Sequence, residues 1–220
     1  MNQLKNTSRQ EIKKLMKISD NLTDLNYDRF QEFETDFSKN SGEPAIYTFK
    51  GDVFQGLEAE NWSEKDLAYA ESRLFILSGL YGLLRPSTLV QPYRLEMGTA
   101  LSTKKAKTLY EFWGSDLTEL INKELSHQQN KILINLASQE YSKAIQFQDI
   151  EATQIIVHFR EWRNEKWTFI SFNAKKARGT MARFIIQERI KDTEGLKGFD
   201  LDGYAYNEEL SSDKELFFTK

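Results

Sequence analysis

The feature that most constrains the fold is the run LSGLYGLLRP at positions 77–86, where two glycines, Gly79 and Gly82, flank two apolar residues. A helical pattern that starts after Ser63 leads directly into this run. A Gly-apolar-apolar-Gly turn behind a helix is typical of helix-hairpin-helix modules, in which glycine lets backbone N–H groups approach a nucleic-acid phosphate. The alternative is a helix that ends at a glycine and continues into a tight turn.

Length and composition set the class of protein. The chain has 220 residues, of which 40% are hydrophobic and 29% charged, which is typical of a soluble globular domain with a full core. It has no cysteine, which excludes disulfides, thiolate metal sites and cysteine nucleophiles. His127 and His158 lie outside any ligand-spaced motif, so we expect neither a metal nor a cofactor. With no apolar run long enough to span a membrane, we expect a cytoplasmic protein without a membrane partner.

Charge is unevenly distributed along the chain, although the formal net charge is only −3. Residues 19–60 carry ten acids against three bases, and residues 192–220 are also acidic. The bases concentrate around 94–107 and 175–189. This pattern predicts a positive cleft on an otherwise acidic surface, and random clustering on solvated faces is the alternative.

The order of elements is that of a mixed α/β domain. Capping residues and apolar spacing predict helices over 9–17, 27–35, 64–77, 107–125 and 174–190. In the second of these we expect Phe30, Phe33 and Phe37 to face inward. Strands are predicted at 45–49, 131–136, 204–206 and 216–219, and a hairpin joins 153–162 to 165–172. Because the composition does not break anywhere, we expect one domain over 1–220, with a mixed sheet surrounded by helices.

A cluster of bases marks the start of the predicted helix at 174–190. Lys175, Lys176 and Arg178 follow the strand that ends at Phe172, and Arg183 lies seven residues after Lys176 on the same face. Positive charge in the first turn of a helix is unfavourable by roughly 0.3–1 kcal/mol per residue, so a bound anion such as phosphate explains the cluster. The alternative is a solvated basic face that pairs with nearby acids.

Polar residues also follow several predicted strands. In α/β folds such residues tend to meet in one crevice, and this set comprises Lys50, Asp52, Arg94, Glu96, Ser138, Glu140 and Lys175. Glu96 or Glu140 would serve there as a general base, which makes an enzyme acting on a nucleotide or nucleobase the alternative function. Ordinary surface ion pairs explain the same residues without catalysis. No phosphate-binding loop, dinucleotide fingerprint or serine elbow is present in the sequence.

Taken together, these segments resemble the YaaA family of bacterial peroxide-stress-resistance proteins. The resemblance covers the chain from Ser8 onward, and it is carried by blocks at 50–57, 77–98, 110–114, 135–141 and 172–179. It implies a cytoplasmic, DNA-binding α/β domain with a helix-hairpin-helix element and a positive cleft. It also implies a role in limiting oxidative damage linked to intracellular iron. The apolar strand and Ser-Pro-Ala-Lys that usually open the family are missing here, so we expect the sheet to lack one strand.

The resulting hypothesis is a DNA-binding protein of the peroxide-stress response, most simply a monomer, with duplex or distorted DNA as its partner. Backbone amides at Gly79–Gly82 and the bases of the predicted helix at 174–190 form the expected surface. Tyr81 is a candidate for stacking on a base or sugar, with a buried aromatic as the alternative. The full expected set is Gly79, Tyr81, Gly82, Arg85, Arg94, Lys104, Lys105, Lys175, Lys176, Arg178 and Arg183.

Overall fold

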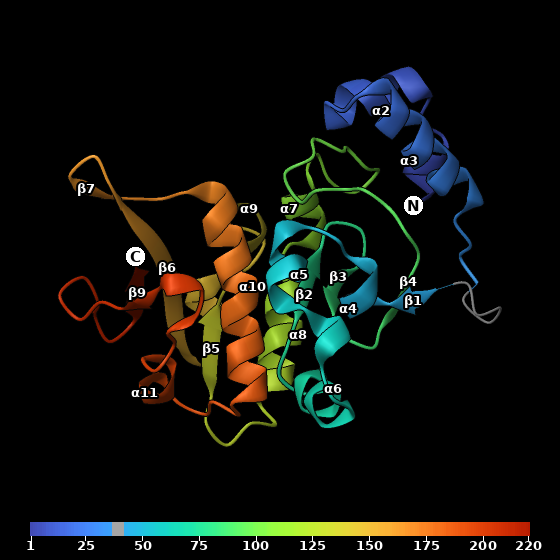
Figure 1. The fold of residues 1–220 in the computed structure, drawn as a ribbon. Helices are drawn as coiled ribbons and strands as arrows, with labels where there is room; N and C mark the ends of the chain where they lie inside the picture. The colour runs from blue at the N-terminus through green and yellow to red at the C-terminus, as the bar shows by residue number, and fades with distance from the viewer. Residues whose placement is uncertain (37–41) are drawn as a thin grey trace. The chain divides into compact units, whose positions relative to one another are not determined.

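The structure is a computed structural model, and it describes residues 1–36 and 42–220 (Figure 1). The chain divides into two units, each assembled from segments that are separated in sequence. The first unit comprises Met1–Thr48, Phe75–Leu117 and Gln139–Ile145, and the second comprises Phe49–Leu74, Thr118–Ser138 and Gln146–Lys220. A single domain over 1–220 stays a prediction. None of the helices in the described residues is both long and apolar enough to cross a membrane.

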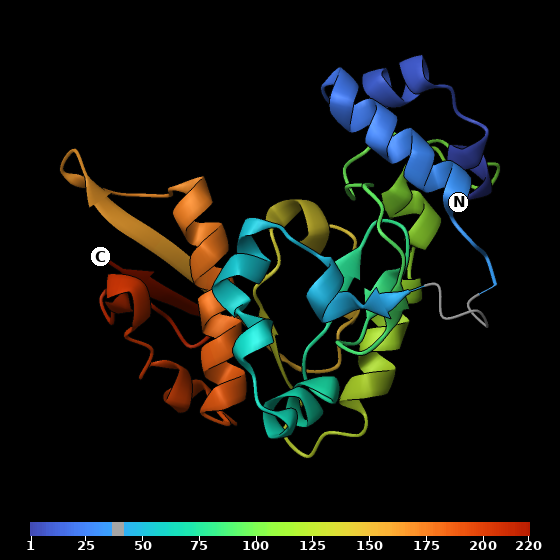
Figure 2. The same ribbon diagram turned by 45° about the vertical axis from the view of Figure 1, so that its right-hand side comes forward.

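The first unit combines short helices with two small antiparallel sheets. Its elements are α1 (Asn2–Lys5), α2 (Arg9–Met16), α3 (Asp20–Glu32), β1 (Glu43–Pro44), α4 (Ala45–Thr48), β2 (Ile76–Ser78), β3 (Gly82–Leu84), β4 (Leu89–Val90), α7 (Leu109–Trp113) and α9 (Gln139–Ser142). β1 pairs with β4, and β2 pairs with β3. The helices α2 and α3 lie side by side, as both views show (Figures 1 and 2).

The second unit is built around a mixed sheet. Its elements are α5 (Asp52–Leu57), η2 (Ala59–Asn61), α6 (Glu64–Glu71), α8 (Asp116–Leu125, which begins in the first unit), β5 (Ile132–Asn135), η3 (Phe147–Asp149), β6 (Thr153–Arg163), β7 (Lys166–Thr168), α10 (Ser171–Gln187), α11 (Thr193–Leu196), η4 (Leu201–Gly203), β8 (Ala205–Tyr206) and β9 (Glu215–Thr219). The strand order is β5-β6-β9-β8, and β7 pairs with β6. β6 runs parallel to β5 and β9, whereas β8 is antiparallel to β9.

The core of the second unit lies between this sheet and α10. Alternate residues of β6, Ile155, Val157 and Phe159, face the helix because successive side chains of a strand point to opposite faces. They pack with Leu216 and Phe218 of β9 and with three residues of α10, namely Ala174, Ala177 and Met181. α10 therefore covers one face of the sheet (Figure 1).

The helices α5 and α10 cross with their backbones almost in contact. A Cβ at position 179 would lie 1.8 Å from the carbonyl oxygen of Val53, and a Cβ at position 56 would lie 2.1 Å from that of Lys176. Gly56 and Gly179 are therefore both needed for this close approach.

Most of the predicted elements are confirmed, and the fold class is mixed α/β as expected. The capping boxes at Ser8 and Ser63 open α2 and α6, and the strands at 131–136 and 216–219 correspond to β5 and β9. The helix expected at 27–35 begins earlier, at Asp20, because Ser19 caps it. Its Phe30 and Phe33 are buried, and Phe37 lies outside the described residues.

Three predicted elements were wrong. The helix expected at 64–77 ends at Glu71, and residues 76–78 form the strand β2. The strand expected at 45–49 is the helix α4, since a short apolar run does not by itself distinguish a strand from a buried helical turn. The helix expected at 107–125 is two helices, α7 and α8. Gly114 separates them with a φ of +49°, a conformation that ends an α-helix.

Candidate nucleic-acid interface

The run at 77–86 forms a β-hairpin, so the helix-hairpin-helix prediction was wrong. α6 ends at Glu71, and β2 and β3 pair in antiparallel fashion with Ser78 opposite Gly82. The apolar residues Ile76 and Leu84 lie opposite each other on the two strands, and both side chains are buried. The helical spacing of residues 67–77 misled the prediction, because its last residues belong to a strand whose side chains alternate.

The turn of this hairpin uses its glycines and amides for internal contacts. The Ser78 hydroxyl accepts the backbone N–H groups of Leu80 at 3.2 Å and of Tyr81 at 2.8 Å. A Cβ on Gly79 would lie 2.4 Å from the carbonyl oxygen of Leu95. Gly82 has a φ of +80°, and a Cβ there would lie 2.8 Å from the Trp113 ring. The structure thus explains both glycines by packing, and their contact with DNA stays a prediction.

Replacing Gly82 with alanine should destabilise the first unit by about 2 kcal/mol, because alanine is strained at positive φ and its methyl group would press on Trp113. Gly203→Ala is the matched control: its φ is +78°, and its Cβ would meet only the end of Lys220, at 3.7 Å. Urea unfolding of the two variants measures the difference. Equal losses would show that Trp113 yields without cost and that only the backbone matters.

The other predicted residues of the first unit are mostly engaged with the protein. The Tyr81 hydroxyl accepts the N–H of Gln91 at 3.0 Å, and its ring packs edge-on against Tyr93. The Arg85 guanidinium lies 4.5 Å from the centre of the Phe75 ring. Arg94 donates to Glu96 at 2.9 Å. Lys104 and Lys105 are exposed in the loop before α7.

The carboxylates predicted for a catalytic crevice have structural partners. Glu140 accepts the backbone N–H of Gly98 at 2.7 Å, and its own carbonyl accepts the Tyr110 hydroxyl at 3.0 Å. Glu140 therefore fixes the loop around Gly98. Arg94 and Glu96 lie with Glu140 in the first unit, whereas the other predicted crevice residues belong to the second, namely Lys50, Asp52, Ser138 and Lys175.

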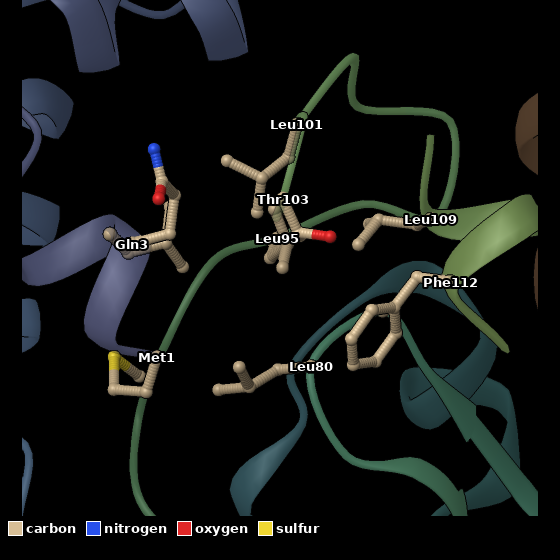
Figure 3. Close-up of a pocket in the computed structure, with 10 residues that line it drawn as sticks. Met1, Gln3, Leu80, Leu95, Leu101, Thr103, Leu109 and Phe112 are labelled. Carbon is tan, nitrogen blue, oxygen red and sulfur yellow. The ribbon is translucent and has the colours of Figure 1, made fainter. Parts of the chain in front are cut away.

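A cavity of about 80 Å³ lies in the first unit, and no charged side chain lines it (Figure 3). Its lining is mostly apolar, with Gln3 and Thr103 as polar side chains, and comes mainly from Leu80, Leu95, Leu101, Leu109 and Phe112. None of the residues predicted for the Lys/Arg/Glu crevice lines this cavity, so the cavity does not correspond to that crevice.

On α10, two of the four predicted bases are paired with acids. Because the helix begins at Ser171, Lys175 and Lys176 lie in its second turn rather than its first. The Lys175 ammonium lies 3.7 Å from Asp52, and Arg183 forms an ion pair with Glu58. For these two residues the structure matches the alternative of a basic face that is paired with acids. Lys176 is half-buried, with its carbonyl at the crossing with α5.

Arg178, like Lys176, forms no ion pair with a carboxylate in the described residues, but it has an aromatic ring beside it. Its guanidinium lies 5.9 Å from the centre of the Phe169 ring. Burial, and then the positive charge of Arg160, lower the pKa of Arg178. The structure thus brings together two arginines that repel each other, which is the arrangement expected of an anion site.

Sequence reasoning missed Arg160. Its guanidinium lies 5.5 Å from the centre of the Phe169 ring and 5.7 Å from that of Phe217, and it donates to the carbonyl of Phe159 at 2.9 Å. The signal was the alternation of β6, which places His158 and Arg160 on the face opposite the buried residues. Nothing in the sequence pattern indicated that this strand and Arg178 would share one surface.

Comparison with known proteins shows which family the chain belongs to. The chain is similar to UPF0246 proteins: 46% identical over 217 residues to that of Saccharophagus degradans, covering 99% of this chain and 85% of the relative. The UPF0246 protein of Alteromonas mediterranea is 49% identical over 210 residues, which cover 96% of this chain and 81% of the relative. The UPF0246 protein of Cellvibrio japonicus is 46% identical over 220 residues, which cover 100% of this chain and 85% of the relative. A family model described as peroxide stress protein YaaA matches residues 1–210. The chain belongs to this family, and the predicted resemblance is confirmed.

Proposed function

We propose that this protein binds DNA in the cytoplasm during the response to peroxide stress, and so limits DNA damage linked to intracellular iron. The observation that carries the proposal is the pair Arg160 and Arg178, whose guanidinium groups both lie within 6 Å of the centre of the Phe169 ring and lack a carboxylate partner in the described residues. Membership in the peroxide stress protein family supports the stress role.

The chemistry of the pair suits a phosphate. A guanidinium presents planar N–H donors that match phosphate oxygens in a bidentate geometry, and two such groups share the charge of one phosphodiester. Phosphate contacts position a protein on DNA without reading sequence, so we expect binding that depends little on sequence. Lys175, Lys176 and Arg183 stay in the proposed surface, with smaller contributions from the two that are already paired with acids.

Replacing Arg178 with glutamine should weaken binding to a short mixed-sequence duplex and lower the log–log salt slope by about one, because one phosphate contact is lost. Arg189→Gln is the matched control, since it removes the same charge just after the same helix, from a residue that is paired with Asp66 and lies outside the proposed surface. Fluorescence anisotropy over a range of salt concentrations measures both slopes. Absence of saturable DNA binding by the unmodified protein at low salt would overturn the proposed function.

A further inference from the structure

The face of the sheet opposite α10 carries charged and aromatic side chains. Along β6, Ile156, His158, Arg160 and Trp162 alternate with the residues that pack under the helix. The register with β9 places His158 beside Phe217, and the two rings stack at 4.4 Å with an angle of 20°. This side of the sheet thus presents aromatic rings and a guanidinium group, whereas the solvated face of a sheet usually carries ordinary polar side chains.

Arg160 lies at the centre of a group that we call the Arg160 patch: His158, Arg160, Phe169, Arg178 and Phe217. The Arg160 guanidinium lies within 6 Å of the centres of both phenylalanine rings, and Phe169 is also within 6 Å of Arg178. Burial, together with the charges of both arginines, lowers the pKa of His158, whereas the neighbouring Glu215 raises it. The Glu215 carboxylate accepts a hydrogen bond from the His158 Nε2 at 3.0 Å and lies at the border of the patch.

Aromatic rings around the patch are unusually exposed. Phe169 is 46% exposed, and Phe172, three residues further along, is 58% exposed. At the nearby hairpin of β6 and β7, which extends beyond the rest of the sheet in Figure 2, Trp162 and Trp167 stack edge-on at 5.0 Å and are also exposed. A cluster of large exposed rings next to two arginines that have no carboxylate partner in the described part of the chain marks a binding surface rather than ordinary protein surface.

We infer that the Arg160 patch binds an unpaired nucleotide of a DNA strand, with Arg160 and Arg178 on its phosphate and Phe169 stacked on its base. This inference rests on the proposed DNA binding and specifies the form of DNA. Exposed bases stack on aromatic side chains in proteins that bind single strands, and cationic guanidinium groups follow the backbone. A duplex offers the same phosphates but keeps its bases inside the helix, so the aromatic rings gain contacts only from an unpaired strand.

The experiment compares one oligodeoxynucleotide as a single strand and as a duplex, at the same salt concentration. We expect the full chain to bind the single strand more tightly. Phe169→Leu should weaken single-strand binding about tenfold, since one stacked base contributes roughly 1–3 kcal/mol, and should change duplex binding less than about twofold. Arg160→Gln should weaken binding to both forms, because both present phosphates.

Two controls separate stacking from general effects. Phe112→Leu changes another exposed phenylalanine, 40% exposed and in the first unit, and Arg73→Gln changes an arginine that also lies over an aromatic ring. Neither should alter the preference for the single strand. Thermal melting confirms that each variant is folded, and Phe169→Met, which removes the same ring but keeps a large side chain, replaces Phe169→Leu if that variant does not fold.

The outcomes distinguish this inference from the proposed function. Equal binding to both forms, or an equal loss on both forms in Phe169→Leu, would overturn the unpaired-nucleotide site and leave DNA binding intact. No binding to either form would instead overturn the proposed function itself. A preference for the single strand that disappears in Phe169→Leu, or in Phe169→Met where that variant replaces it, supports the site.

Discussion

Replacing Gly179 with alanine should destabilise the second unit by roughly 3 kcal/mol or more, since a forced methyl group in a close-packed contact costs 1–3 kcal/mol and here it meets rigid backbone. The added Cβ would lie 1.8 Å from the carbonyl oxygen of Val53 and 2.7 Å from the amide nitrogen of Leu57. Neither atom belongs to a flexible side chain, so α5 and α10 would have to move apart. The urea midpoint and the melting temperature should both fall.

Gly51→Ala is the matched control for this change. Gly51 precedes α5, its φ of −72° and ψ of 168° suit any residue, and no atom lies within 4 Å of the position of its Cβ. We expect its stability to change by less than about 1 kcal/mol, because reduced freedom of the unfolded chain offsets the loss of a favourable glycine cap. A Gly179→Ala protein as stable as Gly51→Ala would show that the two helices do not meet at this point.

The crossing also matters for the candidate interface, because Gly179 directly follows Arg178. A shift of α10 away from α5 would move the Arg178 guanidinium relative to Arg160 on β6. Gly179→Ala should therefore also weaken DNA binding, as an indirect effect that accompanies the loss of stability.

Local signals in the sequence were sufficient for much of the fold. The capping boxes at Ser8 and Ser63 each depend on residues three apart, and both form as expected. The buried strand β5 and the hairpin of β6 and β7 follow from continuous apolar or alternating runs. The hairpin at Gly79–Gly82 was misjudged because a strand that follows a helix can continue the apolar spacing of that helix.

The candidate site was less predictable, because it depends on contacts between segments distant in sequence. Arg178 was identified from its place near a helix start, but only the structure shows that Asp52 and Glu58 pair with Lys175 and Arg183. Arg160 is eighteen residues before Arg178, and only the fold brings their charges together. The charge pattern of the sequence predicted the basic helix, but only the structure shows which of its bases form ion pairs with acids.

Glu161 is the buried charge on which the start of α10 depends. It is 2% exposed, and its carboxylate accepts hydrogen bonds from Asn173 at 2.6 Å, from Tyr204 at 3.0 Å and from Arg163 at 2.9 Å. Lys220 adds a positive charge at 3.6 Å. Because Asn173 belongs to the first turn of α10 and Glu161 to β6, this network connects the helix to the sheet beside the Arg160 patch.

These contacts determine how stability responds to acid. Burial alone would raise the pKa of Glu161, but the hydrogen bonds from Arg163, Asn173 and Tyr204 and the charge of Lys220 outweigh it and lower the pKa to about 2. In the unfolded chain the pKa is near the ordinary value of 4.5. The ionised carboxylate therefore stabilises the folded state fully above that value, and this contribution is lost as the pH falls from about 5 towards 2.

Replacing Glu161 with glutamine should lower the free energy of unfolding at neutral pH by about 3 kcal/mol, since hydrogen bonds to a charged group each contribute roughly 1.5–3 kcal/mol and the amide retains some of them. Glutamine does not ionise, so the difference from the unmodified protein should shrink between pH 5 and pH 2. Glu188→Gln, the same change at an exposed residue after α10, should alter stability by less than about 0.5 kcal/mol. Urea unfolding at a series of pH values measures all three proteins. A difference between Glu161→Gln and the unmodified protein that stays constant down to pH 2 would show that the Glu161 network stabilises the fold through shape rather than through charge.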